Sequence, residues 1–237
     1  MLELLRRVAG TAYDRAGGLV ALNLVWDLAI LPWALVGTAL ALAGEAVRAG
    51  PGVRLTAWLV AAEWILLSPP TALLCAAADE WLQGRSVQLW PLLKARARGL
   101  VRAQALGAAA AAIAGVLGAN AVFYHRVGGW LGAALAALML WMLLALQLVA
   151  LYILPAAVAP RTAGLGAALR QAAALAVQRP GFSAFLLSLL AAVILVGLAT
   201  GVGLILGLAS AASLLLAAGF RHLASTSWDD AAHSASA

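Results

Sequence analysis

The chain has 237 residues, of which 65% are hydrophobic and only 10% are charged, and its formal net charge is +6. A soluble domain normally has about a quarter of its residues charged, so this chain has too few charged groups to cover a water-facing surface. The composition therefore excludes an ordinary soluble protein and predicts one all-α integral membrane domain over residues 1–237.

Long apolar segments predict a polytopic transmembrane helix bundle, because about 20 helical residues cross a bilayer. We expect spans over residues 18–44, 55–78, 100–123, 130–157 and an apolar stretch over 182–220. The last stretch is too long for one span, so we expect it to fold back at Thr200–Gly203, where turn-forming glycines occur. The prediction is six spans, with five as the alternative.

Basic residues are distributed unevenly between these spans. Twelve of the 15 Lys and Arg residues fall on the side that carries both termini, and the other three are Arg48, Arg54 and Arg126. Because excess positive charge marks the cytoplasmic side, residues 1–17 should be cytoplasmic and residues 221–237 a disordered cytoplasmic tail. The net charge then reflects topology and anionic lipid, and no basic segment has the pattern of a nucleic-acid site.

Asp27 lies inside the otherwise apolar first expected span. A charged side chain within a membrane costs roughly 2.5 to 3.5 kcal/mol, so Asp27 should face the bundle interior. Glu63 lies at a similar depth in the next, antiparallel span, and two acids in a low-dielectric setting cannot easily both ionise. Asn23, one turn before Asp27, and Asn120 and Gln147 from other spans could add hydrogen bonds. Two interpretations stay open: a proton or cation relay, and a structural hydrogen-bonded contact.

Two segments between spans predict cytoplasmic amphipathic helices. In residues 86–104 apolar positions recur every four residues beside a basic stripe, and residues 162–182 repeat this plan more weakly, with Leu165, Leu169, Ala172 and Ala176 on one side. Both follow a proline-ended span, which indicates an internal parallel repeat or ordinary hairpin regularity. The basic residues expected to contact lipid or a partner are Lys94, Arg96, Arg98, Arg102, Arg170 and Arg179.

Small residues recur at every fourth position in two of the expected spans. Such rows let helix backbones approach closely in lipid, where apolar burial does not drive helix association. We expect them to mark contacts inside the bundle or between protomers of a homo-oligomer. The glycines in these rows are Gly107, Gly115, Gly203 and Gly207.

No motif for catalysis, metal binding or cofactor binding is recognisable. Cys75 is the one cysteine, the three histidines form no cluster, and no phosphate-binding glycine loop occurs. Asp79 and Glu80, at the end of the second expected span, could bind a cation, although a solvated helix end is the more ordinary interpretation. We expect no metal, no cofactor and no enzymatic activity.

Three segments resemble the YesL-like family of bacterial membrane proteins. They are "LNLVW" in the first expected span, "SPPTALLCAAADEWLQGRSVQLWPLLKARARGLVRAQALG", and "LYILPAAVAPRTAGLGAALRQAAALAVQRPGF". The cytoplasmic helix has fewer aromatic residues than the family pattern, and the segment before Pro69 and Pro70 is longer. The resemblance implies a bacterial cell-membrane protein that accompanies carbohydrate ABC importers, and it supplies no catalytic residues.

These features favour an accessory or assembly partner of a solute ABC importer that contacts its permease or ATPase subunits. The alternative is a small secondary transporter or channel that uses Asp27 and Glu63, and a third hypothesis is an enzyme acting on lipid or glycolipid. No ATP-binding motif occurs in the chain, so it is not expected to energise transport itself.

Overall fold

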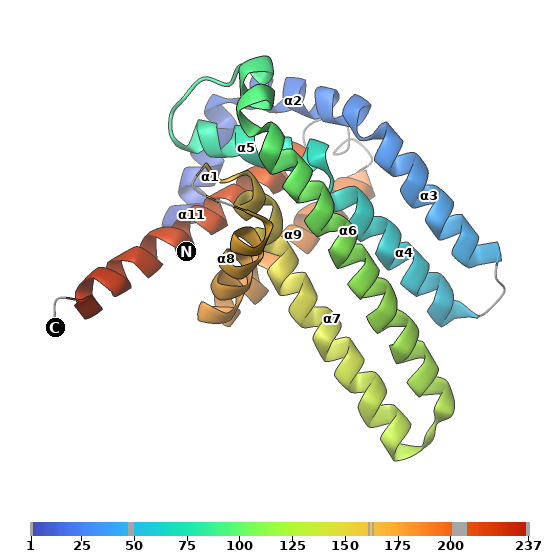
Figure 1. The fold of residues 1–237 in the computed structure, drawn as a ribbon. Coiled ribbons are helices and arrows are strands. Elements are labelled where there is room, and N and C mark those ends of the chain that lie inside the picture. Colours follow the sequence, from blue (N-terminus) through green and yellow to red (C-terminus); the bar gives the residue numbers. More distant parts are fainter. Residues whose placement is uncertain (1, 47–49, 161, 163, 201–207, 236–237) are drawn as a thin grey trace.

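The computed structural model describes residues 2–46, 50–160, 162, 164–200 and 208–235, and it is helical nearly throughout this part of the chain (Figure 1). No β-strand occurs among these residues, which confirms the all-α prediction. The helices are α1 (Leu2–Asp14), α2 (Ala16–Ala29), α3 (Leu31–Ala46), α4 (Pro51–Leu66), α5 (Pro69–Leu82), α6 (Leu89–Val127), α7 (Gly129–Val158), α8 (Leu165–Gln178), α9 (Pro180–Thr200) and α11 (Leu208–Ala235).

Helices α6 and α7 are each long and apolar enough to cross a membrane. Three bent pairs meet the same test: α2 with α3 at 54°, α4 with α5 at 47°, and α8 with α9 at 101°. The described residues thus contain two candidate spans, or five if each bent pair counts as one. The sixth expected span coincides with a shorter apolar segment of α11, Leu208–Ala224. The expected turn at Thr200–Gly203 lies largely outside the described residues.

The bends within the first two expected spans have local causes. Pro32 is the second residue of α3, and its ring has no N–H and crowds the carbonyl of the preceding turn, so the chain bends beside Ile30. Ser68 has an extended backbone, with ψ 160°, and it precedes Pro69 and Pro70 at the start of α5. A residue before proline avoids helical angles, which separates α4 from α5. The first two expected spans therefore each consist of two helices joined at a bend.

The two expected amphipathic helices have different outcomes. Residues 86–104 do not form a separate surface helix, because α6 runs unbroken from Leu89 to Val127, with Pro91 in its first turn where proline is tolerated. Residues 165–178 do form their own helix, α8, which the bend at Pro180 separates from α9. On α8 the alanines Ala172 and Ala176 are buried, whereas Leu165 and Leu169 are exposed.

Helix α11 continues to Ala235, so residues 221–235 are helical where a disordered tail was expected. Leu223 is buried in the core. Its burial fixes the helical turn from which α11 continues to Ala235. Adding a residue to an existing helix is easier than starting a new one, because nucleation is the costly step.

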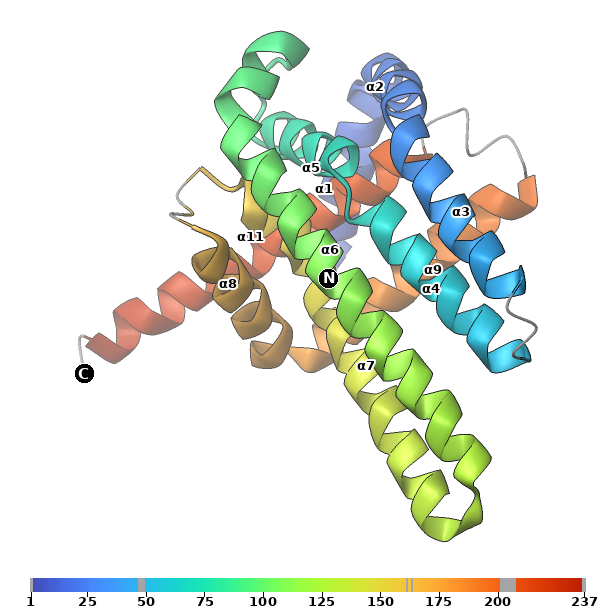
Figure 2. The ribbon, with the colours of Figure 1, turned by 45° about the vertical axis from the view of Figure 1, so that its right-hand side comes forward.

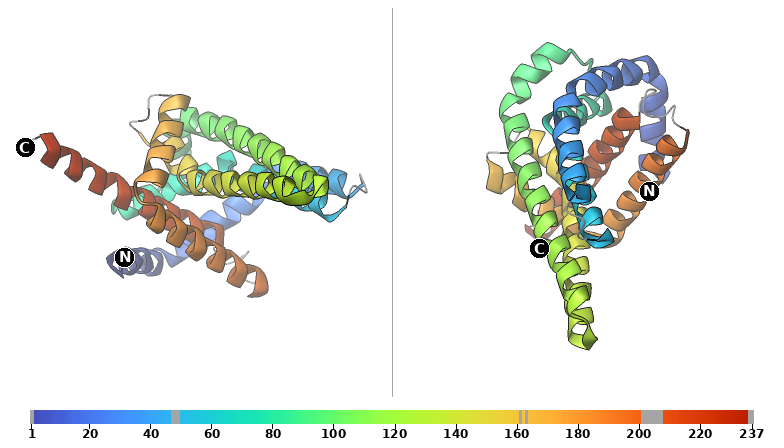
Figure 3. Two further views of the ribbon diagram at one scale, coloured as in Figure 1. Left: turned by 90° about the horizontal axis from the view of Figure 1, so that it is seen from below. Right: turned by 90° about the vertical axis from the view of Figure 1, so that its right-hand side faces the viewer.

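The core lies where α5, the second half of α7, α8 and the first half of α11 meet. Tyr152 of α7 and Leu214 of α11 are fully buried there, and the row of alanines in α5 is almost completely enclosed. In contrast, α6 and α7 extend side by side beyond the other helices (Figures 2 and 3), and Val116, Trp130 and Trp141 on this pair are exposed. An exposed apolar surface of this kind is compatible with contact with the lipid bilayer.

Glycines of α6 allow close packing against the break between α4 and α5. A Cβ atom on Gly107 would lie 2.3 Å from the carbonyl oxygen of Leu67, and one on Gly115 would lie 3.1 Å from Cγ2 of Val60. The structure thus places Gly107 and Gly115 at helix contacts within the bundle. Gly203 and Gly207 lie outside the described residues.

Replacing Gly107 by alanine should destabilise the protein by about 1–3 kcal/mol, because the new methyl group meets backbone that cannot move freely. Thermal unfolding in detergent measures this change. Gly166→Ala is the matched control, since its Cβ atom would meet nothing within 4 Å. Equal melting temperatures for Gly107→Ala and the wild-type chain would contradict the close contact.

Candidate functional site

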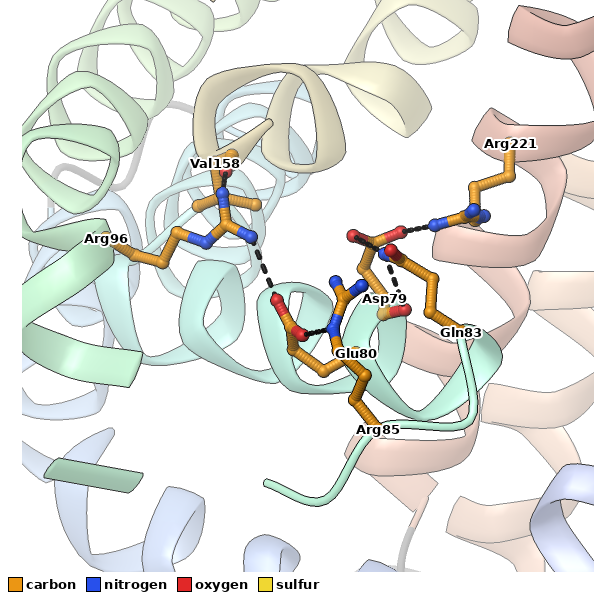
Figure 4. A network of polar contacts seen from close by, with 7 residues as sticks. All are labelled: Asp79, Glu80, Gln83, Arg85, Arg96, Val158 and Arg221. Atoms are coloured by element: carbon orange, nitrogen blue, oxygen red, sulfur yellow. Dashed lines mark hydrogen bonds and ion pairs between the residues drawn. The ribbon is translucent and has the colours of Figure 1, made fainter. Parts of the chain in front are cut away.

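A charged network at the end of α5 joins three other helices (Figure 4). Nη2 of Arg96, from α6, donates a hydrogen bond of 3.0 Å to Oε1 of Glu80, and Nη1 donates one of 3.0 Å to the carbonyl oxygen of Val158 at the end of α7. The side chain of Arg96 is only 12% exposed and that of Glu80 only 16%. One arginine therefore neutralises a half-buried acid and also binds the carbonyl end of α7, where a positive charge is favourable.

The second acid of the network, Asp79, connects α5 to α11. Its Oδ1 accepts a hydrogen bond of 2.7 Å from Nη1 of Arg221, and its Oδ2 accepts one of 2.7 Å from Nε2 of Gln83. In Figure 4, Arg96 and Arg221 reach toward the end of α5 from opposite sides. The two neighbouring acids thus have different partners, and together they hold α6 and α11 against α5.

The turn that ends α5 brings a third arginine to the same place. Gly84 has a positive φ of 74°, its N–H bonds to the carbonyl of Trp81, and the N–H of Arg85 bonds to the carbonyl of Glu80. This pair of bonds is a Schellman motif, which commonly ends a helix at a glycine. The turn returns Arg85 to Glu80, and the hydrogen bond between them raises the pKa of the Arg85 guanidinium above its ordinary value.

Two adjoining cavities open beside this network. The larger has a volume of about 630 Å³ and the smaller about 440 Å³. Arg85, Arg96 and Arg221 line the larger cavity, and Arg96, Arg98 and Arg102 line the smaller. Both cavities share the wall formed by Arg96, Val158, Ala159 and Pro160. The end of the bundle therefore carries a basic recess as well as internal ion pairs.

The two acids predicted within the membrane have separate amide partners. Nδ2 of Asn23 donates a hydrogen bond of 3.1 Å to Asp27, one turn later in α2, while Oδ1 of Asn23 accepts from the backbone N–H of Ala209. Glu63 is buried and accepts a hydrogen bond from Gln147 of α7. Among the described residues no hydrogen bond joins Asp27 to Glu63.

Asn120 belongs to neither of these two sites. Its Nδ2 donates a hydrogen bond of 2.7 Å to the carbonyl of Val116, one turn earlier in α6. The five polar residues expected inside the membrane thus form two separate contacts, at Asn23–Asp27 and Glu63–Gln147, and one local bond within α6.

The predicted basic residues divide into two groups. Arg96 lies inside the network and Arg102 donates a hydrogen bond to the carbonyl of Thr162, so both have partners within the fold. Both arginine side chains are long enough to extend to a neighbouring segment, where carboxylate or carbonyl oxygens accept their hydrogen bonds. The other four predicted basic side chains are exposed: Lys94, Arg98, Arg170 and Arg179.

The charged network around Asp79 and Glu80 was not predicted from the sequence. The sequence did indicate it, because two consecutive acids at the end of an apolar helix need partners when they are not fully solvated. Arginines already neutralise Asp79 and Glu80, so these acids do not require a bound cation. Among the described residues, no group of three or more His, Cys, Asp or Glu side chains could hold a metal ion.

A double-mutant cycle with Glu80→Gln and Arg96→Gln should give a coupling free energy of about 1–3 kcal/mol, because the pair is largely shielded from solvent. Unfolding of the four variants in detergent measures it. The control pair is Glu45 and Arg54, which are 3.4 Å apart and much more exposed, so its coupling should stay below about 1 kcal/mol. Equal coupling in both pairs would contradict a structural role for Glu80 and Arg96.

No family model, curated protein or solved structure matches this chain. The resemblance to the YesL-like family therefore remains a prediction from the quoted sequence segments.

Proposed function

We propose that this chain is a bacterial cell-membrane protein that acts as an accessory or assembly subunit of a solute ABC importer. The contrast between basic residues that are paired inside the fold and basic residues that are exposed supports this proposal most directly. Arg96 and Arg221 are bound to acids inside the fold, whereas Lys94, Arg98 and Arg170 are exposed. The first group stabilises the helix arrangement, and the second presents positive charge to anionic lipid or to a partner subunit. The carbohydrate importer as the partner class comes from the YesL-like resemblance.

The proposed protein crosses the membrane six times and has both termini in the cytoplasm. Packing at the opposite end of the bundle supports this orientation, because a Cβ atom on Gly50 would lie 3.2 Å from Arg126, and one on Gly52 would lie 2.7 Å from Val122. The two connections that are poor in basic residues therefore lie at one end of the bundle. Arg85, Arg96 and Arg221 share the other end, as the positive-inside rule requires of a cytoplasmic face.

Labelling with a membrane-impermeant maleimide tests this orientation. In a Cys75→Ala background, single cysteines at exposed Arg54 or Val127 should react in intact cells, whereas cysteines at exposed Lys94 or Arg98 should react only after permeabilisation. Reaction at residue 94 in intact cells would reverse the proposed orientation.

A small secondary transporter or channel is the second candidate function. The buried Glu63, bonded to Gln147 beside the break that separates α4 from α5, favours it, because broken helices often build transport sites. Asp27 accepts a hydrogen bond from Asn23 instead of sharing a site with Glu63, and this favours structural contacts over a transport site. Solute uptake by liposomes that contain this chain alone, lost in Glu63→Gln, would favour the transporter.

An enzyme acting on lipid is the weakest of the three hypotheses, and we propose no enzymatic activity. Asp79 and Glu80 are the acids nearest the basic recess, and both are held by arginines. A general acid or base has to exchange a proton with its substrate, and a carboxylate fixed by a charged partner is poorly suited to this exchange.

The double variant Lys94→Glu/Arg98→Glu should lose co-purification with importer subunits in mild detergent, while its folding and yield stay near those of the wild-type chain. Both side chains are exposed and lie outside the acid network, so the loss would report on contact rather than on stability. Quantitative mass spectrometry of the purified fractions measures it. The matched control, Arg54→Glu/Arg126→Glu, makes the same change in charge at the opposite end.

Equal recovery of permease and ATPase subunits with both double variants would contradict a docking role for the basic face. Recovery of no importer subunit with the wild-type chain would contradict the proposed function itself. Basic residues near a membrane surface contribute roughly 1 kcal/mol each to contact with anionic lipid. The experiment therefore also measures the phospholipid that remains bound to each variant.

A further inference from the structure

We propose that the two adjoining cavities at the end of α5 form a binding site for a phosphate group, carried either by an anionic phospholipid or by a soluble phosphorylated compound. The site belongs to this chain alone, so the proposal does not depend on the importer partnership. Two observations support it: the excess of positive charge around the cavities, and a lining that combines polar and apolar side chains.

The charge balance of the recess is strongly positive. Among the described residues, five arginines line the two cavities and the acids bound to them are Asp79 and Glu80, which leaves an excess of three positive charges in this part of the chain. A guanidinium has five N–H donors, and the bond between Arg221 and Asp79 uses only Nη1 of Arg221. Arginine also matches the geometry of a phosphate group, because two of its N–H groups can bind two oxygens at once.

Arg102 is held in the wall of the smaller cavity. Its Nη1 donates a hydrogen bond to the carbonyl of Thr162, which lines the same cavity. Its Nε is buried and has no hydrogen-bond partner in the described part of the chain, so this atom is closed off from the cavity. The guanidinium therefore contributes its positive charge to the cavity from a fixed position.

The lining of the larger cavity combines polar and apolar side chains. Gln83 and Gln171 add amide groups to the arginines, and Pro155, Ala217 and Phe220 are apolar. A ligand with a phosphate group and an attached uncharged portion suits such a mixed lining. This chemistry is shared by a phospholipid headgroup with its glycerol backbone and by a small phosphorylated solute.

Thermal unfolding of the purified full-length chain in a neutral detergent tests the site, because a ligand that binds only the folded state raises the unfolding temperature in a saturable manner. The probes are inorganic phosphate, glucose 6-phosphate and dihexanoyl phosphatidylglycerol, each compared with sodium chloride at equal ionic strength. A saturable rise with phosphatidylglycerol alone assigns the site to a lipid headgroup. A saturable rise with either soluble probe assigns it to a soluble phosphorylated compound.

Two variants locate the binding. Arg98→Gln should weaken the binding of the active probe about tenfold, the effect of losing one charge-assisted hydrogen bond. Arg170→Gln removes the same charge from an exposed position on α8 outside both cavities and should leave the binding unchanged. If Arg98→Gln folds poorly, Arg85→Gln provides the same test in the larger cavity.

Two results would overturn the proposal. One is that no probe raises the unfolding temperature more than sodium chloride does. The other is an equal loss of affinity in Arg98→Gln and Arg170→Gln, which would show that the probe responds to the general surface charge.

Discussion

The neutralisation of Asp79 and Glu80 at the end of α5 is the interaction on which the surrounding helix arrangement depends. Two adjacent carboxylates in a bundle with so few charges are costly unless each has a charged or hydrogen-bonding partner. The partners come from α6 and α11, and Arg96 of α6 also binds the carbonyl end of α7. Loss of Arg221 would leave Asp79 without its charged partner, and loss of Arg96 would leave Glu80 with Arg85 of the same turn alone. The positions of α6 and α11 against α5 are therefore linked to this one requirement.

Polar groups elsewhere in the bundle are satisfied in a different way. Asp27 and Glu63 have amide partners, Asn23 and Gln147, and the indole N–H of Trp26 donates a hydrogen bond to Thr71. The Glu63–Gln147 and Trp26–Thr71 contacts each join two helices. The charged contacts are concentrated at one end, where the exposed Lys94 and Arg98 also lie, and this separation favours a binding surface there over a polar route through the bundle.

Much of the fold could be predicted from composition and helical periodicity. The all-α class and most helix positions follow from the apolar segments, and the Asn23–Asp27 contact follows from a spacing of one helical turn. The bends could also have been predicted from Pro32, Pro69 and Pro70. The pairing of Asp79 with Arg221 could not, because the two residues are 142 positions apart and meet only through packing. The basic stripe over residues 86–104 predicts a helix that lies on the membrane surface or rises out of it, because a surface helix and the first turns of a long span have the same periodicity.

The basic recess is a consequence of where the helices end. Small side chains in α5 let α7 and α11 approach it closely, so the core has little free space between helices. Helix α5 ends at the Gly84 turn and α7 ends at Val158, whereas α11 continues past both and α6 passes beside them. Beyond the ends of α5 and α7, only long side chains can extend over the space between α6 and α11. The residues at these positions are arginines. The ion pairs hold this end in one arrangement, and the charge that they leave unbalanced makes the same place suited to an anion.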